Sequence, residues 1–273
     1  MRRVETIRLL ALMAPLAAVI GAFFLVPLGV LAVIGGSGSL GLAAYALIVT
    51  DPRYFSSTVM TVLLSLAVTA VTLVISGFAA VFLNRYRFFG RALVISMMTL
   101  PLAFSGVVIA FMVIMLGGRQ GVITDLVDVI FGQRFVFAYT VVGLFTAYIY
   151  FSIPRTILTI LAAAEKLDPR LEEAARSLGA RPWQVLRDVV IPGLKPALIA
   201  AGAICFATSM GAFGTPFALG TKIEVLPMTI YTSFIVQANI AVAAALSFIL
   251  GLMTWLILAL ARTAAGSTVA AAG

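Results

Sequence analysis

Apolar stretches long enough to cross a lipid bilayer recur along this whole sequence, and they constrain its fold more than any other feature. A membrane-spanning helix needs roughly 20 predominantly apolar residues. Because the bilayer core holds no water, each stretch must satisfy its own backbone hydrogen bonds, which favours helices. The sequence therefore predicts an all-α membrane protein with about six transmembrane helices. Their expected bounds are 7–34, 59–83, 92–116, 135–153, 195–219 and 240–261.

Composition supports this fold class. Of the 273 residues, 63% are hydrophobic and only 10% are charged, whereas a soluble domain carries about 25% charged residues. No stretch is left for a separate soluble domain. The expected organisation is a single transmembrane domain over residues 1–273, with a core at about 54–262 and a polar loop at about 164–195.

The segments between the spans are assigned from their composition. Residues 35–57 are expected to form a loop in which Asp51 caps a helix, because the proline after it suits the first helical position. Residues 117–134 place apolar side chains at helical spacing among charged ones, which predicts an amphipathic helix at the membrane surface. Residues 221–239 are expected to form an outer loop, and the Ala-rich tail from Arg262 is expected to be disordered.

Lysines and arginines are distributed unevenly between the two sides of the predicted membrane. Segments that face the cytoplasm are enriched in these residues. With the N-terminus inside, the outer loops hold only Arg53, Arg119, Arg134 and Lys222. Both termini and the polar loop are therefore expected in the cytoplasm. Pro154 and Arg155 are expected to mark the polar end of the fourth span, with helix continuing over 156–164.

The residue types that most enzymes and metal sites need are missing. The chain has no histidine, and Cys205 is its only cysteine, which excludes His-based catalysis, disulfides within the chain and the usual zinc sites. No G-x-x-x-x-G-K-[ST] motif for binding ATP phosphates occurs. The chain is therefore expected to be no enzyme and to hold no cofactor or metal itself. The net charge of +8 does not indicate nucleic acid, because the basic residues stand singly beside apolar spans.

The only long polar interval, 172–192, reads EEAARSLGARPWQVLRDVVIP. Asp168 provides an N-cap ahead of a first short helix, and Gly179 stands where a helix commonly ends in the left-handed conformation. Pro192 is expected to stop a second short helix. Two helices bent at a glycine would form a compact projection. From these features alone, a helix that merely covers the ends of the spans explains the interval equally well.

The same interval resembles the cytoplasmic loop of the permease subunits of ATP-binding-cassette (ABC) importers. That loop has the pattern E-A-A, three residues, G, nine residues, I-x-L-P. Glu173-Ala174-Ala175, Gly179 and the end at Pro192 match its spacing, with Val189 and Ile191 as mild departures. The broader likeness covers about 54–252 and is similar to the type I branch that serves polyamines, ferric iron, thiamine or phosphonates. It is carried by the stretches 51–55, 207–220 and 226–231.

The resemblance implies that this loop is the coupling helix that docks on an ATPase subunit. It assigns a polar contact to Glu173, close packing to Ala174 and Ala175, and the turn to Gly179. The full set of residues that the resemblance implies for ATPase coupling is Glu172, Glu173, Ala174, Ala175, Leu178, Gly179 and Pro192.

The partners and the location follow from the same resemblance. A type I importer contains two ABC ATPase subunits that bind ATP and Mg²⁺, a second permease that is identical or homologous, and an extracytoplasmic substrate-binding protein. This chain would then be a multi-pass permease of the bacterial cytoplasmic (inner) membrane, in contact with lipid and with no nucleic acid. It would form half of the substrate pathway.

A patch of small and polar residues in the fifth span is a candidate lining of that pathway. Its members are Thr208, Ser209, Met210, Phe213 and Thr215. Close packing between helices explains such small residues equally well. Some polyamine permeases carry acidic residues here, where this chain has Gly211 and Ala212, so a polycation is less expected. The alternative function is an ion- or proton-coupled secondary transporter, which the lack of carboxylates within the spans disfavours.

Overall fold

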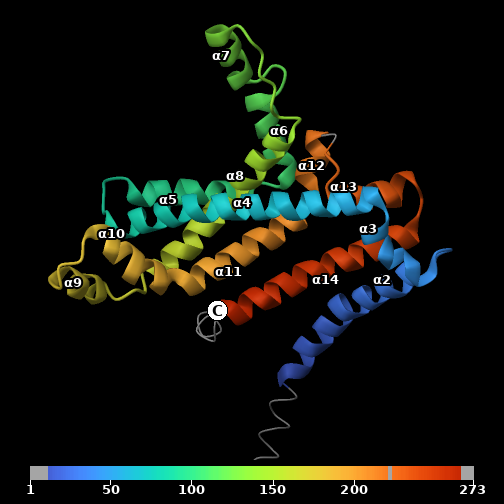
Figure 1. Ribbon diagram of the computed structural model, residues 1–273, viewed down its shortest axis with the longest axis horizontal. Helices are drawn as coiled ribbons and strands as arrows, with labels where there is room; N and C mark the ends of the chain where they lie inside the picture. Colours follow the sequence, from blue (N-terminus) through green and yellow to red (C-terminus); the bar gives the residue numbers. More distant parts are fainter. Residues whose placement is uncertain (1–11, 221–222, 266–273) are drawn as a thin grey trace, which may run out of the picture. The chain divides into compact units, whose positions relative to one another are not determined.

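The computed structural model describes residues 12–220 and 223–265 (Figure 1). Every regular element within these ranges is a helix, which confirms the predicted all-α fold. Six helical segments in this part of the chain are long and apolar enough to cross a membrane, as expected. They are Leu12–Gly36, Pro52–Arg85, Gly106–Phe131, Val141–Ala164, Pro182–Met210 and Ile240–Thr263.

The helices group into two compact units, and the first comprises the described residues before 59 together with 229–252. A π-helical turn, η1 (Gly21–Leu25), leads into α2 (Val26–Gly36). The Tyr45 hydroxyl donates a hydrogen bond to the carbonyl of Ala32, and its ring meets that of Phe248 edge-on at 6.0 Å. These contacts hold α2 against α14 (Ile240–Ala265). The remaining elements of this unit are η2 (Gly41–Ala46), α3 (Leu47–Thr50), the start of α4 and η5 (Thr232–Val236).

The second unit comprises residues 59–228, apart from the undescribed 221–222, and the described residues after 252. The central helix is α8 (Val141–Ala164), the most buried of the six membrane-length segments. The others are α4 (Pro52–Arg85), α5 (Arg91–Thr99), η3 (Leu100–Ala103), α6 (Gly106–Gly117), α7 (Val122–Phe131), α9 (Pro169–Ser177), α10 (Pro182–Val185), η4 (Leu186–Val190), α11 (Ile191–Met210), α12 (Gly214–Leu219) and α13 (Leu226–Tyr231).

Two apolar cores stabilise this unit. One joins α4, α6, α8, α11 and α12 around Leu144 and Tyr148. The other joins α4, α8, α10, η4 and α11 around Ile157, Ile160 and Val185. Since α8 contributes to both cores, it links the two ends of the unit, and the second core lies directly beneath the polar interval predicted as the coupling loop.

The predicted third span, 92–116, is not one helix. The chain leaves the helical conformation at Phe104, and Ser105 starts a new helix by capping it, with its Oγ 3.5 Å from the amide nitrogen of Val108. Pro101 and this cap break the span into α5, η3 and α6. The segment of membrane-spanning length is instead Gly106–Phe131, whose last part, α7, is the amphipathic helix predicted within 117–134.

Pro154 does not end the fourth span, because α8 runs through it from Val141 to Ala164. A proline inside a helix removes one backbone hydrogen bond and introduces a steric conflict. Here Tyr148 before Pro154 and Ile157 after it are buried in the two cores, and this packing stabilises the helix. Arg155 consequently lies inside a membrane-length helix rather than at a polar end.

The fifth span begins and ends earlier than predicted. The helical path runs from Pro182 to Met210, and the chain then leaves the helix at Gly211 before α12 begins at Gly214. Pro192 does not stop a helix, contrary to the prediction. It stands in the first turn of α11, directly after the π-helical turn η4, where its missing N–H costs no regular hydrogen bond.

Two predicted loops contain helices. Residues 226–236 of the predicted outer loop are helical, while 221–222 lie outside the described residues. In the loop predicted at 35–57, Asp51 caps α4 as expected, with its Oδ1 accepting from the Arg53 amide at 2.9 Å. However, α4 begins at Pro52, ahead of the predicted start at 59. α14 continues to Ala265, and the rest of the predicted disordered tail lies outside the described residues.

Candidate coupling site

The first half of the polar interval folds as its local chemistry predicts. Asp168 caps α9, with its Oδ1 accepting from the Arg170 amide at 2.9 Å. α9 ends at a left-handed Gly179 with φ +86°. The Ala180 amide donates to the Ala175 carbonyl at 3.1 Å, which together with the glycine forms a Schellman-type end. The predicted cap and glycine turn are therefore both confirmed.

One face of α9 is tied to the rest of the second unit. Arg85 Nη2, at the end of α4, lies 2.7 Å from Glu172 Oε2, and Arg176 donates to the same oxygen at 3.3 Å. Ala175 packs against the second core. Glu172 and Ala175 thus face inward, and the Arg85–Glu172 pair joins α9 to α4.

The opposite face of α9 is open. Glu173 and Ala174 are exposed, and Leu178 is 89% exposed. The Glu173 carboxylate forms no ion pair or hydrogen bond with any described residue. Trp183, at the start of α10, is 61% exposed. We call Glu173, Ala174, Leu178 and Trp183 the outer face; it combines an unpaired acid with two large apolar side chains.

Two further contacts fasten the base of the polar interval. Arg91 of α5 pairs with Glu165 at 3.1 Å and also donates to the Leu83 carbonyl at 2.8 Å. The Asn84 amide donates to the Ala164 carbonyl at 3.2 Å. Sequence reasoning missed Asn84, Arg85 and Arg91 as anchors. The sequence did hold a signal for them, because the basic turn that contains Arg85 and Arg91 lies on the same predicted side of the membrane as the segment that contains Glu165 and Glu172.

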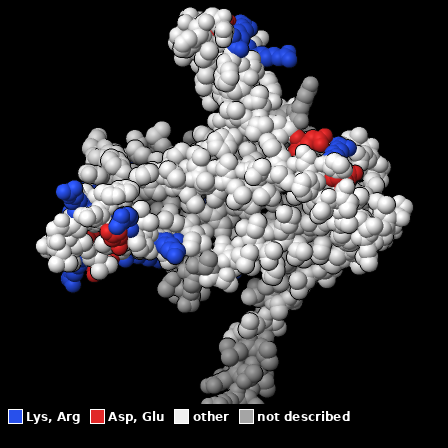
Figure 2. Space-filling model, viewed as in Figure 1, with Lys and Arg blue, Asp and Glu red and all other residues white. Residues whose placement is uncertain are grey.

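The charge distribution follows this architecture. In the second unit, Lys and Arg gather around α9 and α10 and at the tip formed by α7, while the surface between them carries almost no charge on the face shown (Figure 2). Asp128 of α7 pairs with Arg134 at 3.0 Å. Charged ends separated by an apolar belt are what a bilayer requires.

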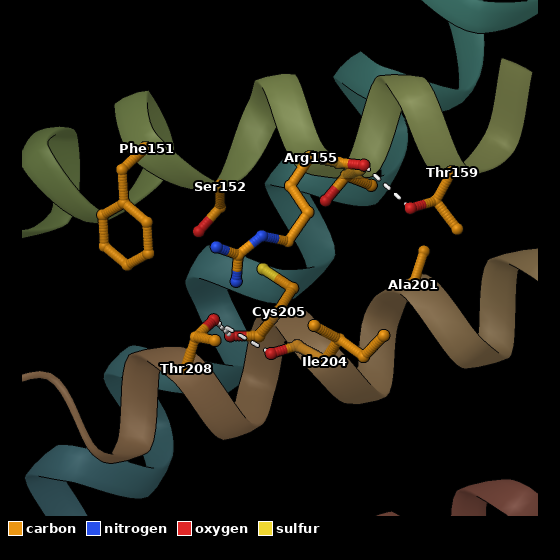
Figure 3. A pocket seen from close by; sticks show the side chains of 9 residues that line it. Phe151, Ser152, Arg155, Thr159, Ala201, Ile204, Cys205 and Thr208 are labelled. Atoms are coloured by element: carbon orange, nitrogen blue, oxygen red, sulfur yellow. Dashed lines mark hydrogen bonds between the residues drawn. The ribbon is translucent and has the colours of Figure 1, made fainter. Parts of the chain in front are cut away.

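The residues predicted to line a substrate pathway divide into three groups. Phe213 and Thr215 line a cavity of about 210 Å³, together with Phe104, Phe151 and Arg155. Thr208 lines a small adjoining pocket between α8 and α11 (Figure 3). Ser209 and Met210 are fully buried and line neither of these two spaces.

Arg155 is the residue that sequence reasoning missed in this region. It lines both the cavity and the small pocket, whereas the sequence predicts the polar end of a span at this position. The signal that could have found it is the length of the apolar pattern on both sides, which leaves one arginine inside a membrane-length stretch.

Comparison with known proteins decides the family. The model of the family described as "Binding-protein-dependent transport system inner membrane component" matches residues 72–266. The chain belongs to this family. Family membership confirms the predicted resemblance to ABC importer permeases and the expected location in the inner membrane, and it favours this function over a secondary transporter.

Curated relatives are permeases of several systems. The chain is 33% identical to the molybdenum transport system permease ModB of Escherichia coli K12, over 68% of this chain and 82% of the relative. It is 28% identical to a putative 2-aminoethylphosphonate permease, PhnU, of Salmonella typhi, over 93% and 92%. A chloroplastic sulfate permease of Chlamydomonas reinhardtii is 32% identical over 72% of this chain, which spans about half (52%) of that relative.

A solved structure shares the fold. A chain of the bacterial alginate ABC transporter, crystallised with its alginate pentasaccharide-bound periplasmic protein, superposes with a TM-score of 0.78 at 19% identity. The match covers 94% of this chain and 93% of the other. This confirms the predicted fold of an ABC importer transmembrane domain.

Proposed function

We propose that α9 of this permease is the element that couples substrate passage to ATP hydrolysis on separate subunits. The observation that carries the proposal is the division of α9 into two faces. Its outer face is exposed and holds the unpaired Glu173 and the open Leu178. Its inner face is joined to α4 through Glu172 and Arg85 at 2.7 Å. A partner that grips the outer face would move α4.

The partners proposed are those of a type I importer. Two ABC ATPase subunits would bind ATP and Mg²⁺, since this chain has no phosphate-binding loop of its own. A second permease, identical or homologous, would complete the pathway around a two-fold or pseudo-two-fold axis. A substrate-binding protein would deliver the solute on the outer side; the periplasmic protein in the alginate transporter structure supports this.

The mechanism is a mechanical switch rather than bond chemistry. Closure of the ATPase pair would displace α9, and three connections would carry the displacement into the membrane: the Arg85–Glu172 pair to α4, the Arg91–Glu165 pair to α5, and the second core to α8 and α11. Packed helices have discrete arrangements, so such a push changes the population of inward-open and outward-open states.

The substrate proposed is a small oxyanion. The relatives support this class, because they are permeases of molybdenum, sulfate and 2-aminoethylphosphonate transport systems. The absence of acidic residues from α8, α11 and α12 also fits an anion better than a polycation.

Uptake into proteoliposomes tests this function. The complete complex, co-purified from cells that express its partner subunits, is reconstituted with its binding protein, and uptake of labelled molybdate, sulfate and 2-aminoethylphosphonate is followed. We expect uptake of at least one anion that requires ATP and the binding protein and is insensitive to ion gradients. Uptake that persists without ATP and collapses with the ion gradient would establish a secondary transporter instead.

A further inference from the structure

Arg155 is placed where a charge is costly. It lies well inside α8 (Val141–Ala164), a helix of membrane-spanning length. An arginine within a membrane span is unfavourable unless it faces water, a partner charge or a ligand, and such residues commonly serve a function. The position of Arg155 therefore needs a physical explanation.

No partner charge explains it. The Arg155 guanidinium forms no ion pair and donates no hydrogen bond to any residue that the structure describes. Neither α8 nor α11, which packs against it, contains an aspartate or glutamate. Among the described residues, the positive charge is thus left uncompensated.

Arg155 is exposed in the isolated chain, and its guanidinium lines the space between α8 and α11 instead of lying at the end of the helix. In Figure 3 it extends from α8 over Cys205, toward Ser152 on one side and Thr208 of α11 on the other. Arg155 and Phe151 line both this small pocket and the cavity of about 210 Å³. That volume corresponds to several water molecules at about 30 Å³ each, so a small hydrated or partly dehydrated solute fits.

Two more features of the same space favour a negative ligand. Ser152 is only 4% exposed, lines the small pocket beside Arg155, and its Oγ has no hydrogen-bond partner within the described residues. Such a buried hydroxyl is usually paired. The N-terminal end of the twelve-residue helix α6, at Gly106, also lines the cavity, and helix N-termini carry partial positive charge.

We propose that Arg155, assisted by Ser152, forms an anion-binding subsite within the translocation pathway of this permease. This inference rests on the proposed transport function and assigns a residue to recognition of its substrate. Arginine suits the role because its planar fork binds oxyanions through two parallel hydrogen bonds and keeps its charge at any physiological pH. The ligand class is a small oxyanion of the sulfate, molybdate or phosphonate type.

The test uses a cysteine as a local probe of charge. Cys205 is the only cysteine, so Cys205→Ala gives a cysteine-free full-length chain, and Ala212→Cys places one thiol on the cavity that Arg155 lines. Three versions carry Arg155, Arg155→Lys or Arg155→Gln. In phosphatidylcholine nanodiscs, the thiol is modified with methanethiosulfonates that are anionic, cationic or neutral, and the neutral reagent reports access and folding.

With Arg155 present, we expect the thiol to react faster with the anionic reagent than with the cationic one. Arg155→Gln should lower the ratio of these two rates roughly tenfold. Arg155→Lys should keep most of the ratio. Millimolar sulfate, molybdate or 2-aminoethylphosphonate should slow modification of the Arg155 version and not of Arg155→Gln. Arg155→Lys should show weaker protection, because an ammonium lacks the planar fork.

Four results would overturn the inference. The first is a ratio of anionic to cationic modification rates that does not change in Arg155→Gln, and the second is a changed ratio with no protection of the thiol by any of the three anions. The third is that no version reacts with the neutral reagent. The fourth is that only anionic phosphatidylglycerol in the nanodisc protects the thiol. The last would assign the site to lipid phosphate.

The same preparations separate this inference from the proposed function. Glu172→Gln is expected to impair ATP coupling while leaving the labelling ratio unchanged. If the anions still protect the thiol in a complex that shows no ATP-driven uptake, only the proposed function is contradicted. ATP-driven uptake that Arg155→Gln does not alter would contradict only the anion subsite.

Discussion

Arg85 Nη2 of α4 lies 2.7 Å from Glu172 Oε2 of α9, although 87 residues separate the two in sequence. Both side chains are partly shielded, with 28% and 19% of their surfaces exposed. The pair is the only side-chain ion pair between α9 and another element within the described ranges. It connects the proposed ATPase-binding element to a membrane-length helix.

Removing this ion pair should affect transport more than stability. Glu172→Gln and Arg85→Gln are each expected to lower ATP-driven uptake severalfold. The free energy of unfolding should fall by no more than about 1 kcal/mol, the range for exposed pairs. Because both residues act through one contact, the double variant should be no worse than either single variant. Uptake and thermal denaturation in detergent, measured as a double-mutant cycle, check this.

The matched control is Arg176→Gln, which removes the second partner of Glu172 at 3.3 Å within α9. It leaves the connection to α4 in place, so uptake should stay near that of the wild type. Strictly additive losses in the double variant, or an equal loss in Arg176→Gln, would show that the Arg85–Glu172 contact transmits nothing.

Substitution of Gly179 should act through backbone strain alone. Its φ of +86° is unfavourable for any residue with a Cβ, yet no atom lies within 4 Å of a Cβ placed there. Gly179→Ala should therefore destabilise the α9 turn by roughly 1–2 kcal/mol, and Gly179→Val should uncouple ATP hydrolysis from uptake. Gly179→Asn, which tolerates this conformation better, should retain more coupling.

The control for Gly179 is Gly77→Ala in α4, where the Cβ also meets open space but the backbone is helical. Alanine should be neutral or stabilising there. Undiminished ATP-driven uptake in Gly179→Val would mean that the turn is not needed for coupling.

Gly106 is required because α6 and α12 approach closely. A Cβ on Gly106 would lie 2.8 Å from Thr215 Oγ1 and 3.2 Å from the Thr215 amide nitrogen. Gly106→Ala should therefore lower stability by about 1–3 kcal/mol, as overpacking does. Adding Thr215→Ala should recover part of this loss by removing the side-chain clash. Gly251→Ala, with open space around its Cβ, is the control; equal melting temperatures for all variants would refute the close contact.

Thr61 fastens α13 to α4. Its Oγ1 accepts a hydrogen bond from the Leu226 amide at 2.8 Å, and both residues are buried. Thr61→Val keeps the shape but leaves this amide without its acceptor, which should cost about 1–3 kcal/mol. Thr69→Val should cost less, because within the described residues the Thr69 hydroxyl bonds only to the Ser65 carbonyl one turn earlier in the same helix. Similar thermal stabilities for the two variants would contradict this role.

Features set by local chemistry were predictable from the sequence. Six long apolar stretches predicted the all-α fold, since hydrocarbon admits few other structures. The caps at Asp51 and Asp168 and the turn at Gly179 depend only on neighbouring residues, so they were correct as well. Element ends were less predictable, because the effect of a proline depends on its surroundings. Pro154 is held within α8 by packing on both sides, and Pro192 follows a π-helical turn.

Long-range contacts could not be predicted. Nothing near Glu172 in sequence indicates that its partner is Arg85, and the apolar pattern around Arg155 indicates a position inside a span but not which cavity it lines. The division of the polar interval into an inner and an outer face likewise appears only when α9 is packed against the second core. Sequence motifs located the site, and tertiary contacts showed which face of α9 packs inward and which is exposed.

The most direct test of the account is the subunit composition of the complex extracted in mild detergent, measured by native mass spectrometry together with its ATPase activity. Wild type is compared with Glu173→Ala and Leu178→Ser, which alter the outer face and touch no described partner in this chain. We predict that wild type carries two ATPase subunits and a second permease, and that both variants lose the ATPase subunits or their stimulation by substrate. A wild-type protein that is extracted alone or as a pure homo-oligomer, without ATPase subunits, would contradict the coupling function of α9. Full stimulation of the ATPase activity by substrate in both variants would contradict it as well.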